Sequence, residues 1–228
     1  MYFRLFLAFC LALLPVSAAA SSGHEPEAGH EGALITVTVL GSGTPVPSAT
    51  QAGASILVEA GGEYFMFDCG RACTTRLAQV DPRLVSRVHN LFLTHMHSDH
   101  IVGIPDLWLN GWTQNRTRPL TTWGPIGTVD FFGALRLAFR RDIEFRLADG
   151  VPASDAGLVP DFHDLPPEGG VVYEENGVTV TAFLVDHAAI KPAYGYKLEY
   201  AGKSVVISGD TTVAENLYTY GAGADVLM

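Results

Sequence analysis

Four side chains that bind metal ions well lie within six consecutive positions of the segment 93–103, "LTHMHSDHIVG". His95 and His97 are two residues apart, so in an extended segment both side chains point the same way and can bind one cation. Asp99 and His100 follow where the chain is expected to turn, and can reach a second cation. Imidazole nitrogens and carboxylate oxygens are good zinc ligands. The spacing therefore favours a metal site over a histidine-rich polar loop.

Two more ligands are expected where later strands end. "LVDHAAI" ends an apolar run at His187, and "VVISGDTT" ends another at Asp210. Loops at strand ends are where proteins often place binding and catalytic residues. Taken alone, His187 could be an ordinary hydrogen-bonded histidine and Asp210 could cap a helix. Together with the cluster, both are predicted to be metal ligands.

The segments that must position these residues alternate between strands and helices. β-branched and apolar runs predict strands within 34–48, 54–70, 88–94 and 119–127, and hairpins within 169–187 and 193–210 that turn at Asn176–Gly177 and Ala201–Gly202. Apolar residues at helical spacing predict helices within 72–79, 104–112, 128–142 and 211–220. Antiparallel runs of strands with helices between them predict an α/β (α+β) fold of two sheets covered by helices.

The two ends of the chain differ from the rest. Residues 1–20 have a basic Arg4, an apolar stretch and small residues before Ser21, which predicts a signal peptide and a periplasmic or secreted protein. A retained membrane anchor is the alternative, and no membrane contact is expected after cleavage. A flexible leader (21–33) and a hydrolase domain (34–228) follow. The chain stops inside an expected strand, so we expect that domain to be C-terminally incomplete.

Charge and cysteine content narrow the possible partners. The chain has 14 Lys and Arg against 24 Asp and Glu, a net charge of −10. Such an acidic protein repels a phosphate backbone at long range, so a nucleic-acid partner is not expected. Cys69 and Cys73 are four residues apart at a predicted helix start. A disulfide there would close a tight loop, so we expect two small, half-buried side chains.

The motifs resemble those of the metallo-β-lactamase superfamily: H-x-H-x-D-H, the later "VDH", and "SGDT". Within it, "LGSGTPVPS", "FDCG", "WGPIG" and "AYGYK" resemble the ribonuclease Z and arylsulfatase-like branch, in order from Leu34 onward. The resemblance implies an αββα sandwich with a dinuclear zinc site on its edge, its last strands and helix missing here. It also implies the ligands: His95, His97 and His187 for one zinc, Asp99 and His100 for the other, and Asp210 bridging them.

Two departures from that branch bear on the substrate. Its ribonucleases carry a long insertion between the equivalents of His187 and Asp210 that grips transfer RNA, whereas only 22 residues separate the two here. A final histidine ligand and a histidine proton donor would lie beyond the end of this sequence. The resemblance thus implies an enzyme without the arm, acting on a small-molecule ester, and relatives of this kind commonly form homodimers.

Two Zn²⁺ ions would lower the pKa of a shared water and stabilise a developing anionic oxygen, with Asp99 orienting the hydroxide. Mn or Fe would suit the same ligands. The first prediction is an exported phosphodiesterase. An arylsulfatase is the next alternative, then a lactone or β-lactam hydrolase, and an inactive metal-binding fragment is the non-enzymatic one.

Residues near the ligands are candidates for the substrate pocket. Thr44 lies in the Gly- and Pro-rich loop after the first strand, and Trp108, like Trp112 and Trp123, could form a pocket wall or simply pack in the core. Lys191 and Tyr194 follow soon after His187 and could contact a leaving group or an anion.

Overall fold

The computed structural model describes residues 34–152, 154–159 and 161–228. The predicted signal peptide and leader therefore lie outside the described residues. Across those ranges, none of the helices combines the length and hydropathy needed to cross a membrane.

Within the described ranges, a six-stranded sheet has the order β1-β2-β3-β4-β5-β6. The strands are β1 (Ile35–Gly41), β2 (Ser55–Ala60), β3 (Glu63–Phe67), β4 (Asn90–Phe92), β5 (Thr121–Gly124) and β6 (Phe162–Asp164). β1 to β3 pair antiparallel, whereas β3 to β6 pair in parallel. The expectation of antiparallel strands was thus wrong for three of the five pairings in this sheet. Helical segments between β3, β4, β5 and β6 supply the long crossovers that parallel neighbours require.

The second sheet has the order β11-β10-β9-β8-β7 in the described part of the chain. Its strands are β7 (Gly169–Glu175), β8 (Val178–Leu184), β9 (Tyr194–Tyr200), β10 (Lys203–Ile207) and β11 (Val226–Leu227). Both predicted hairpins are present, and Asn176 and Gly177 have the positive φ angles, 53° and 75°, that a tight hairpin turn demands. The expected final strand is present as β11, which pairs in parallel with β10.

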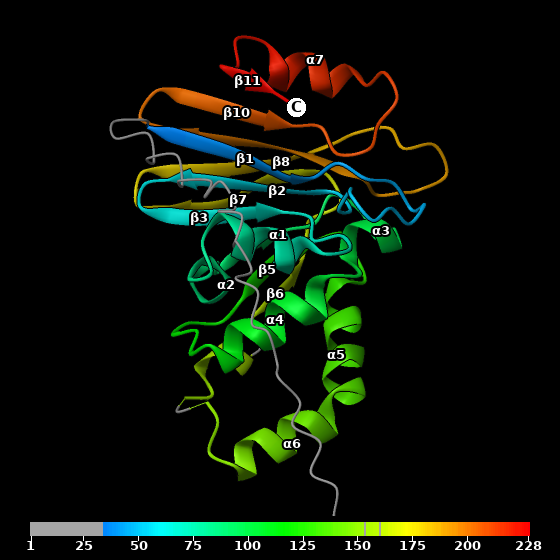
Figure 1. Ribbon diagram of the computed structural model, residues 1–228. Coiled ribbons are helices and arrows are strands. Elements are labelled where there is room, and N and C mark those ends of the chain that lie inside the picture. Colours follow the sequence, from blue (N-terminus) through cyan, green and yellow to red (C-terminus); the bar gives the residue numbers. More distant parts are fainter. Residues whose placement is uncertain (1–33, 153, 160) are drawn as a thin grey trace, which may run out of the picture. The chain divides into compact units, whose positions relative to one another are not determined.

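The helices flank the two sheets. They are α1 (Cys73–Val80), α2 (Leu84–Arg87), α3 (Ser98–Ile101), α4 (Ile104–Thr113), α5 (Thr128–Ala138), α6 (Arg140–Ala148), the 3₁₀ turn η1 (Ala156–Leu158) and α7 (Glu215–Gly221). Figure 1 shows α7 on the outer side of β10, with α1 to α6 on the opposite side of the sheets. This αββα layering confirms the predicted fold class.

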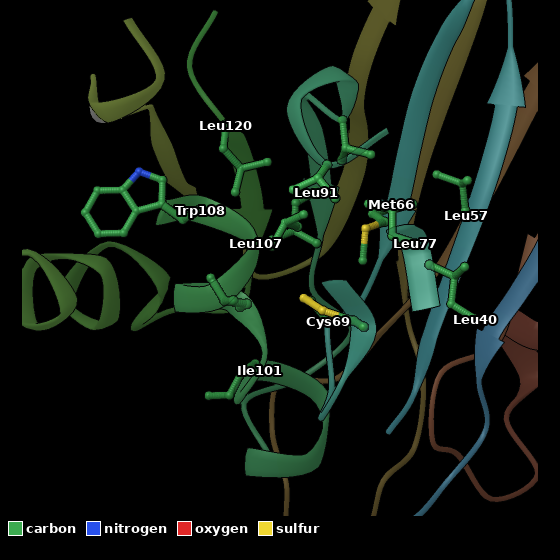
Figure 2. Close-up of a cluster of buried hydrophobic side chains, with 14 of the residues drawn as sticks. Leu40, Leu57, Met66, Cys69, Leu77, Leu91, Ile101, Leu107, Trp108 and Leu120 are labelled. Carbon is green, nitrogen blue, oxygen red and sulfur yellow. A yellow bond between two sulfur atoms is a disulfide. The ribbon is translucent and has the colours of Figure 1, made fainter. Parts of the chain in front are cut away.

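Two buried apolar clusters hold the layers together. One lies between the first sheet and its helices and includes Leu77, Leu91 and Trp108 (Figure 2). The other lies between the two sheets and includes Phe65, Tyr196 and residues of β8 and β10. Burial of this apolar surface is the main force that holds the layers in place.

An aromatic row ties the parallel strands together where they end. Phe67, Phe92 and Trp123 are opposite one another in β3, β4 and β5. Their rings stack at centroid distances of 5.1 Å for Phe67–Phe92 and 4.8 Å for Phe92–Trp123. Such offset stacks add to the energy of burial. The row fixes the carboxyl ends of β3 and β4 side by side, and the metal-binding motif begins there.

Cys69 and Cys73 form a disulfide with a Cα–Cα distance of 5.4 Å, so the expectation of two separate half-buried side chains was wrong. Both side chains are fully buried. Ala72 has a φ of 65°, and this left-handed residue turns the chain so that Cys73 begins α1 close to Cys69. Four-residue spacing can thus meet the usual Cα–Cα distance of a disulfide.

Candidate metal centre

Each predicted ligand lies just after a strand that the sheets hold in place. The segment after β4 carries His95 and His97 and leads into α3, which carries Asp99 and His100. His187 follows β8 of the second sheet. Because both sheets end at the same edge, residues from positions 95 to 210 meet in one cluster.

Three imidazoles form the first ligand set, here called the imidazole group: His95, His97 and His187. His95 Nε2 lies 3.0 Å from His97 Nδ1, which lies 3.2 Å from His187 Nε2. Ligands of a tetrahedral zinc ion at about 2.0–2.1 Å lie roughly 3.3 Å apart. Both of these spacings are close to the one that a zinc ion would require, and all three donor atoms lie within 4.8 Å of one another.

The tautomer of His95 is set by its neighbour Thr94. The Thr94 hydroxyl donates its only proton to Asp68 Oδ2 at 2.7 Å, so it must accept from His95 Nδ1 at 2.9 Å. Burial, together with the neighbouring His100, lowers the pKa of His95 to about 4. Neutral His95 therefore directs the lone pair of Nε2 into the imidazole group.

The second set, here called the carboxylate group, consists of His95, His100 and Asp210, whose donor atoms lie within 4.8 Å of one another. His100 Nε2 is 3.6 Å from Asp210 Oδ2 and 3.7 Å from Asp99 Oδ2. Asp99 is buried, whereas the Asp210 side chain is 52% exposed. The two sets share His95, and Asp99 lies beside the second set, so the structure brings all six predicted ligands together.

Asp68 is a functional residue that the ligand pattern did not reveal. This buried carboxylate accepts from Thr94 N at 2.8 Å, from the Thr94 hydroxyl at 2.7 Å and from His100 Nδ1 at 2.7 Å. It thereby orients His100 directly and His95 through Thr94. Carboxylates that hold metal-binding histidines commonly set their orientation and basicity. The signal was present in "FDCG", where an acid directly follows a buried strand.

Without a bound cation, the carboxylate group holds a proton. Burial by itself would lower the pKa of His100, but the carboxylates of Asp210 and Asp68 raise it to about 10. The same interaction with His100 lowers the pKa of Asp210. A metal ion that bound His100 Nε2 would have to displace this proton.

Two glycines let α3 approach the strands closely. An ideal Cβ on Gly70 would lie 2.1 Å from the carbonyl oxygen of Asp99, and one on Gly53 would lie 2.8 Å from the same oxygen. Any side chain at either position would push α3 away. These close contacts fix the backbone that carries Asp99 and His100.

A cleft of about 520 Å³ opens beside the carboxylate group. Asp99, His100 and Asp210 line it, and so does Thr44, the residue proposed above for a substrate pocket. The remaining walls are largely apolar and include Val39, Ile56, Phe67, Ile207 and Met228. The described residues that line it include neither Lys nor Arg.

The other pocket candidates lie elsewhere. Trp108 is buried in the helix-side core against Phe132, because α4 buries Ile104, Leu107, Trp108 and Trp112 at helical spacing. Trp123 packs in the aromatic row. Tyr194 is buried and its hydroxyl donates to the carbonyl of Pro166 at 2.9 Å. Lys191 is exposed on the loop after β8 and does not line the cleft. The pocket roles predicted for Trp108 and Tyr194 were therefore wrong.

The donor set fits divalent transition metals. Imidazole nitrogens and carboxylate oxygens suit Zn²⁺, Mn²⁺ and Fe²⁺. His95 and His100 are both held through Nδ1, which leaves Nε2 of each facing the cluster. The charge of the site also suits divalent cations. The acidic Asp99 and Asp210 would offset the charge of a second cation.

Comparisons with known proteins agree with this architecture. The family model "Anti-Pycsar protein Apyc1" matches residues 35–125. A Ribonuclease Z of Mycobacterium sp. (strain KMS) is 40% identical over 197 residues, which cover 86% of this chain and 68% of the relative. Human tRNase Z, short form, has a TM-score of 0.62 and 26% identity over 84% of this chain and 76% of its own. The metallo-β-lactamase fold protein YhfI from Bacillus subtilis has a TM-score of 0.63 and 19% identity over 85% of this chain and 69% of its own.

The layered sheets and the histidine–aspartate cluster at their edge define a hydrolase of the metallo-β-lactamase fold. Within that class, the chain belongs to the ribonuclease Z family. The predicted absence of a long arm is confirmed, because the residues between His187 and Asp210 form a short loop and the β9–β10 hairpin.

Proposed function

We propose that this protein is a zinc-dependent phosphodiesterase that cleaves a small diester. The observation that carries the proposal is the convergence of His95 Nε2, His97 Nδ1 and His187 Nε2 beside a second set that contains Asp210. When bound there, two zinc ions would lower the pKa of a water molecule and neutralise charge on the phosphate oxygens.

The chain's own residues support the remaining tasks. Asp99 is buried next to His100 and lines the cleft, where its carboxylate would orient the attacking water and accept its proton. Thr44 on the rim can donate a hydrogen bond to a non-bridging oxygen of the substrate. The apolar walls formed by Val39, Ile56 and Ile207 would take an organic group of the ester.

A small substrate is favoured over transfer RNA for two reasons. The hairpin between His187 and Asp210 provides no extended arm to grip a large RNA. In addition, the net charge of −10 opposes a polyanionic substrate. The relatives named above carry the name of a ribonuclease, so structured RNA should be tested as a competing substrate.

The test uses the zinc-loaded full chain and compares cleavage of bis(p-nitrophenyl) phosphate with cleavage of p-nitrophenyl sulfate. We expect the diester to be cleaved faster, and His97→Ala to reduce the rate by at least about a thousandfold, as removal of a metal ligand should. His163→Ala is the matched control, since His163 is exposed on β6 and pairs only with Asp161 and Trp123 in the described contacts.

Other results of this test would favour a different function. Faster sulfate cleavage would favour the arylsulfatase alternative. Cleavage of a lactone alone would favour a lactone or β-lactam hydrolase. If zinc binds but none of the esters turns over, the non-catalytic metal-binding alternative gains support. Equal loss of activity in His97→Ala and His163→Ala would contradict a role for the cluster.

The proposal also includes export, which rests on the composition of residues 1–20. Expression of the full chain in a bacterium, followed by N-terminal sequencing of periplasmic protein, tests it. Cleavage after Ala20 is the expected result, and an intact N-terminus in the cytoplasm would refute it.

A further inference from the structure

A covalent cross-link lies directly beneath the carboxylate group. Cys69 and Cys73 are joined, and both are buried in the helix-side cluster that also contains Met66 and Leu77 (Figure 2). Neither of the two ligand sets uses these sulfurs. The position of the disulfide raises the question of what it controls.

The backbone of Cys69 is hydrogen-bonded to the C-terminal end of α3 and to the residues just after it. Its N–H donates to the carbonyl of His100 at 2.8 Å, and its carbonyl accepts from the N–H of Gly103 at 2.9 Å. Packing is equally close, since a Cβ on Gly103 would lie 2.7 Å from Cys73 Sγ. Any shift of the cross-linked turn is therefore transmitted to His100 through direct contacts.

The residue before the cross-link is Asp68, which orients His100. Asp68 has a φ of 57° and Ala72 a φ of 65°, a left-handed conformation that residues other than glycine rarely adopt. Surrounding contacts must hold such residues in place. The hydrogen bond from Asp68 N to Phe92 O, 2.8 Å, fixes one side of the turn. The disulfide closes the other side.

We propose that the Cys69–Cys73 pair is a redox-controlled positioning device for the carboxylate group. In the bonded form it holds Asp68 where its carboxylate meets His100 Nδ1. A dithiol reductant would transfer two electrons and two protons to the pair, which breaks the S–S bond, gives two thiols and leaves the reductant as its own disulfide. The freed turn relaxes, Asp68 loses its fixed orientation, and the carboxylate group binds its cation less tightly.

Cation binding by the imidazole group provides an internal reference for the effect of reduction. His97 and His187 contact each other and His95, whose tautomer also depends on Thr94, but neither contacts the cross-linked turn in the described interactions. Reduction should therefore weaken binding of one cation much more than binding of the other. The inference rests on the proposed metal centre but not on the identity of the ester.

The test is a titration of the metal-free full chain with Co²⁺, followed by its visible absorption. One sample is oxidised, and the other is reduced with dithiothreitol and then desalted without oxygen. We expect the weaker of two Co²⁺ affinities to fall about tenfold on reduction, within the range of 5- to 150-fold typical of coupled sites. The tighter affinity should change little, and reoxidation should restore both.

A control chain, Cys69→Ser with Cys73→Ser, retains Cys10 and should bind Co²⁺ like the reduced protein whether or not it is treated with reductant. Circular dichroism establishes that it is folded. By reciprocity, bound Co²⁺ should disfavour reduction of the native disulfide by the same factor, a test that needs no variant. Equal Co²⁺ affinities in the two redox forms would overturn the proposal, as would a new thiolate-to-cobalt absorption band after reduction. These readouts are independent of ester cleavage.

Discussion

The two ligand sets of the metal centre differ in how the protein prepares them. The imidazole group has three nitrogens 3.0 and 3.2 Å apart, and two of its members come from a single short segment. The carboxylate group relies on His100. Its Nδ1 donates to Asp68, and its Nε2 lies 3.6 Å from Asp210 Oδ2. Sequence spacing places two of the three imidazoles, whereas His100 is oriented by contacts with residues far away in the sequence.

This difference predicts different behaviour towards protons and metals. Neutral His95 already offers a lone pair, because burial keeps its pKa at about 4. His100 instead holds a proton between carboxylates at neutral pH. The imidazole group should thus bind its cation first and more tightly, and the carboxylate group should fill second.

The largest effect is expected from removal of His95, the residue that belongs to both ligand sets. His95→Ala should abolish retention of both ions on dialysis, whereas His187→Ala should affect chiefly the imidazole group and Asp210→Ala chiefly the carboxylate group. Metal content measured by mass spectrometry distinguishes the three variants. If His187→Ala and Asp210→Ala each lost both ions, the two sets would act as one unit.

The number of protons released on metal binding should also differ between the two ligand sets. Binding at the carboxylate group displaces the His100 proton, so its metal affinity should rise about tenfold per pH unit between about pH 7 and pH 10. Affinity of the imidazole group should show no such slope above pH 8. Calorimetric titrations in buffers of different ionisation enthalpy count the protons. Equal proton release for both ions would refute the distinction.

Asp68→Asn should lower metal affinity by about 10- to 100-fold, with the larger loss at the carboxylate group, because the amide presents a donor towards His100. Asp161→Asn is a matched control. Asp161 also accepts from a threonine, Thr121 at 2.6 Å, and from His163 at 2.9 Å, but it lies just before β6 and its side chain is 38% exposed. Competition with a chromogenic chelator measures both variants. A loss of similar size in Asp161→Asn would mean that the effect is general.

Thr94→Val should have a smaller effect, a loss of up to about tenfold that falls more evenly on both sets. Valine keeps the shape of threonine but accepts nothing from His95 Nδ1 and donates nothing to Asp68. Thr94→Ser should restore nearly native affinity, because the hydroxyl is retained. An unchanged affinity in Thr94→Val would show that His95 needs no partner.

In the metal-free protein, the two histidines should affect stability at opposite ends of the pH scale. The raised pKa of His100 adds stability that is complete below its ordinary value of 6.5 and is lost as pH rises through about 10. The lowered pKa of His95 adds stability that is present above 6.5 and is lost as pH falls towards 4. Urea unfolding from pH 4 to 10 measures both, and His100→Gln should remove only the alkaline loss.

The sequence indicated the ligands and the strands because their signals are local. H-x-H-x-D-H depends only on alternation and a turn, and the Asn176–Gly177 turn has a strong preference for one conformation. The role of Asp68 depends on contacts with residues 26 and 32 positions away, which no local pattern contains. The same holds for the disulfide, which requires a left-handed Ala72.

Trp108 shows a different kind of failure. The burial of Ile104, Leu107, Trp108 and Trp112 follows the helical repeat and could have been inferred from their spacing. Of the two roles left open for Trp108, a pocket wall rested on nearness to the metal motif in the sequence, and core packing rested on this repeat. The pocket role predicted for Tyr194 also rested on nearness in the sequence. Alternation along β9 instead turns Tyr194 towards the core between the sheets.

The close approach of Gly53 and Gly70 to the Asp99 carbonyl has a consequence for mutational tolerance. In a saturation scan, these two positions should be as intolerant as the histidines, although neither carries a reactive group. A search for the active site by chemical type alone would pass over them. In this protein the absence of a side chain at two positions is as much a part of the catalytic architecture as the presence of six others.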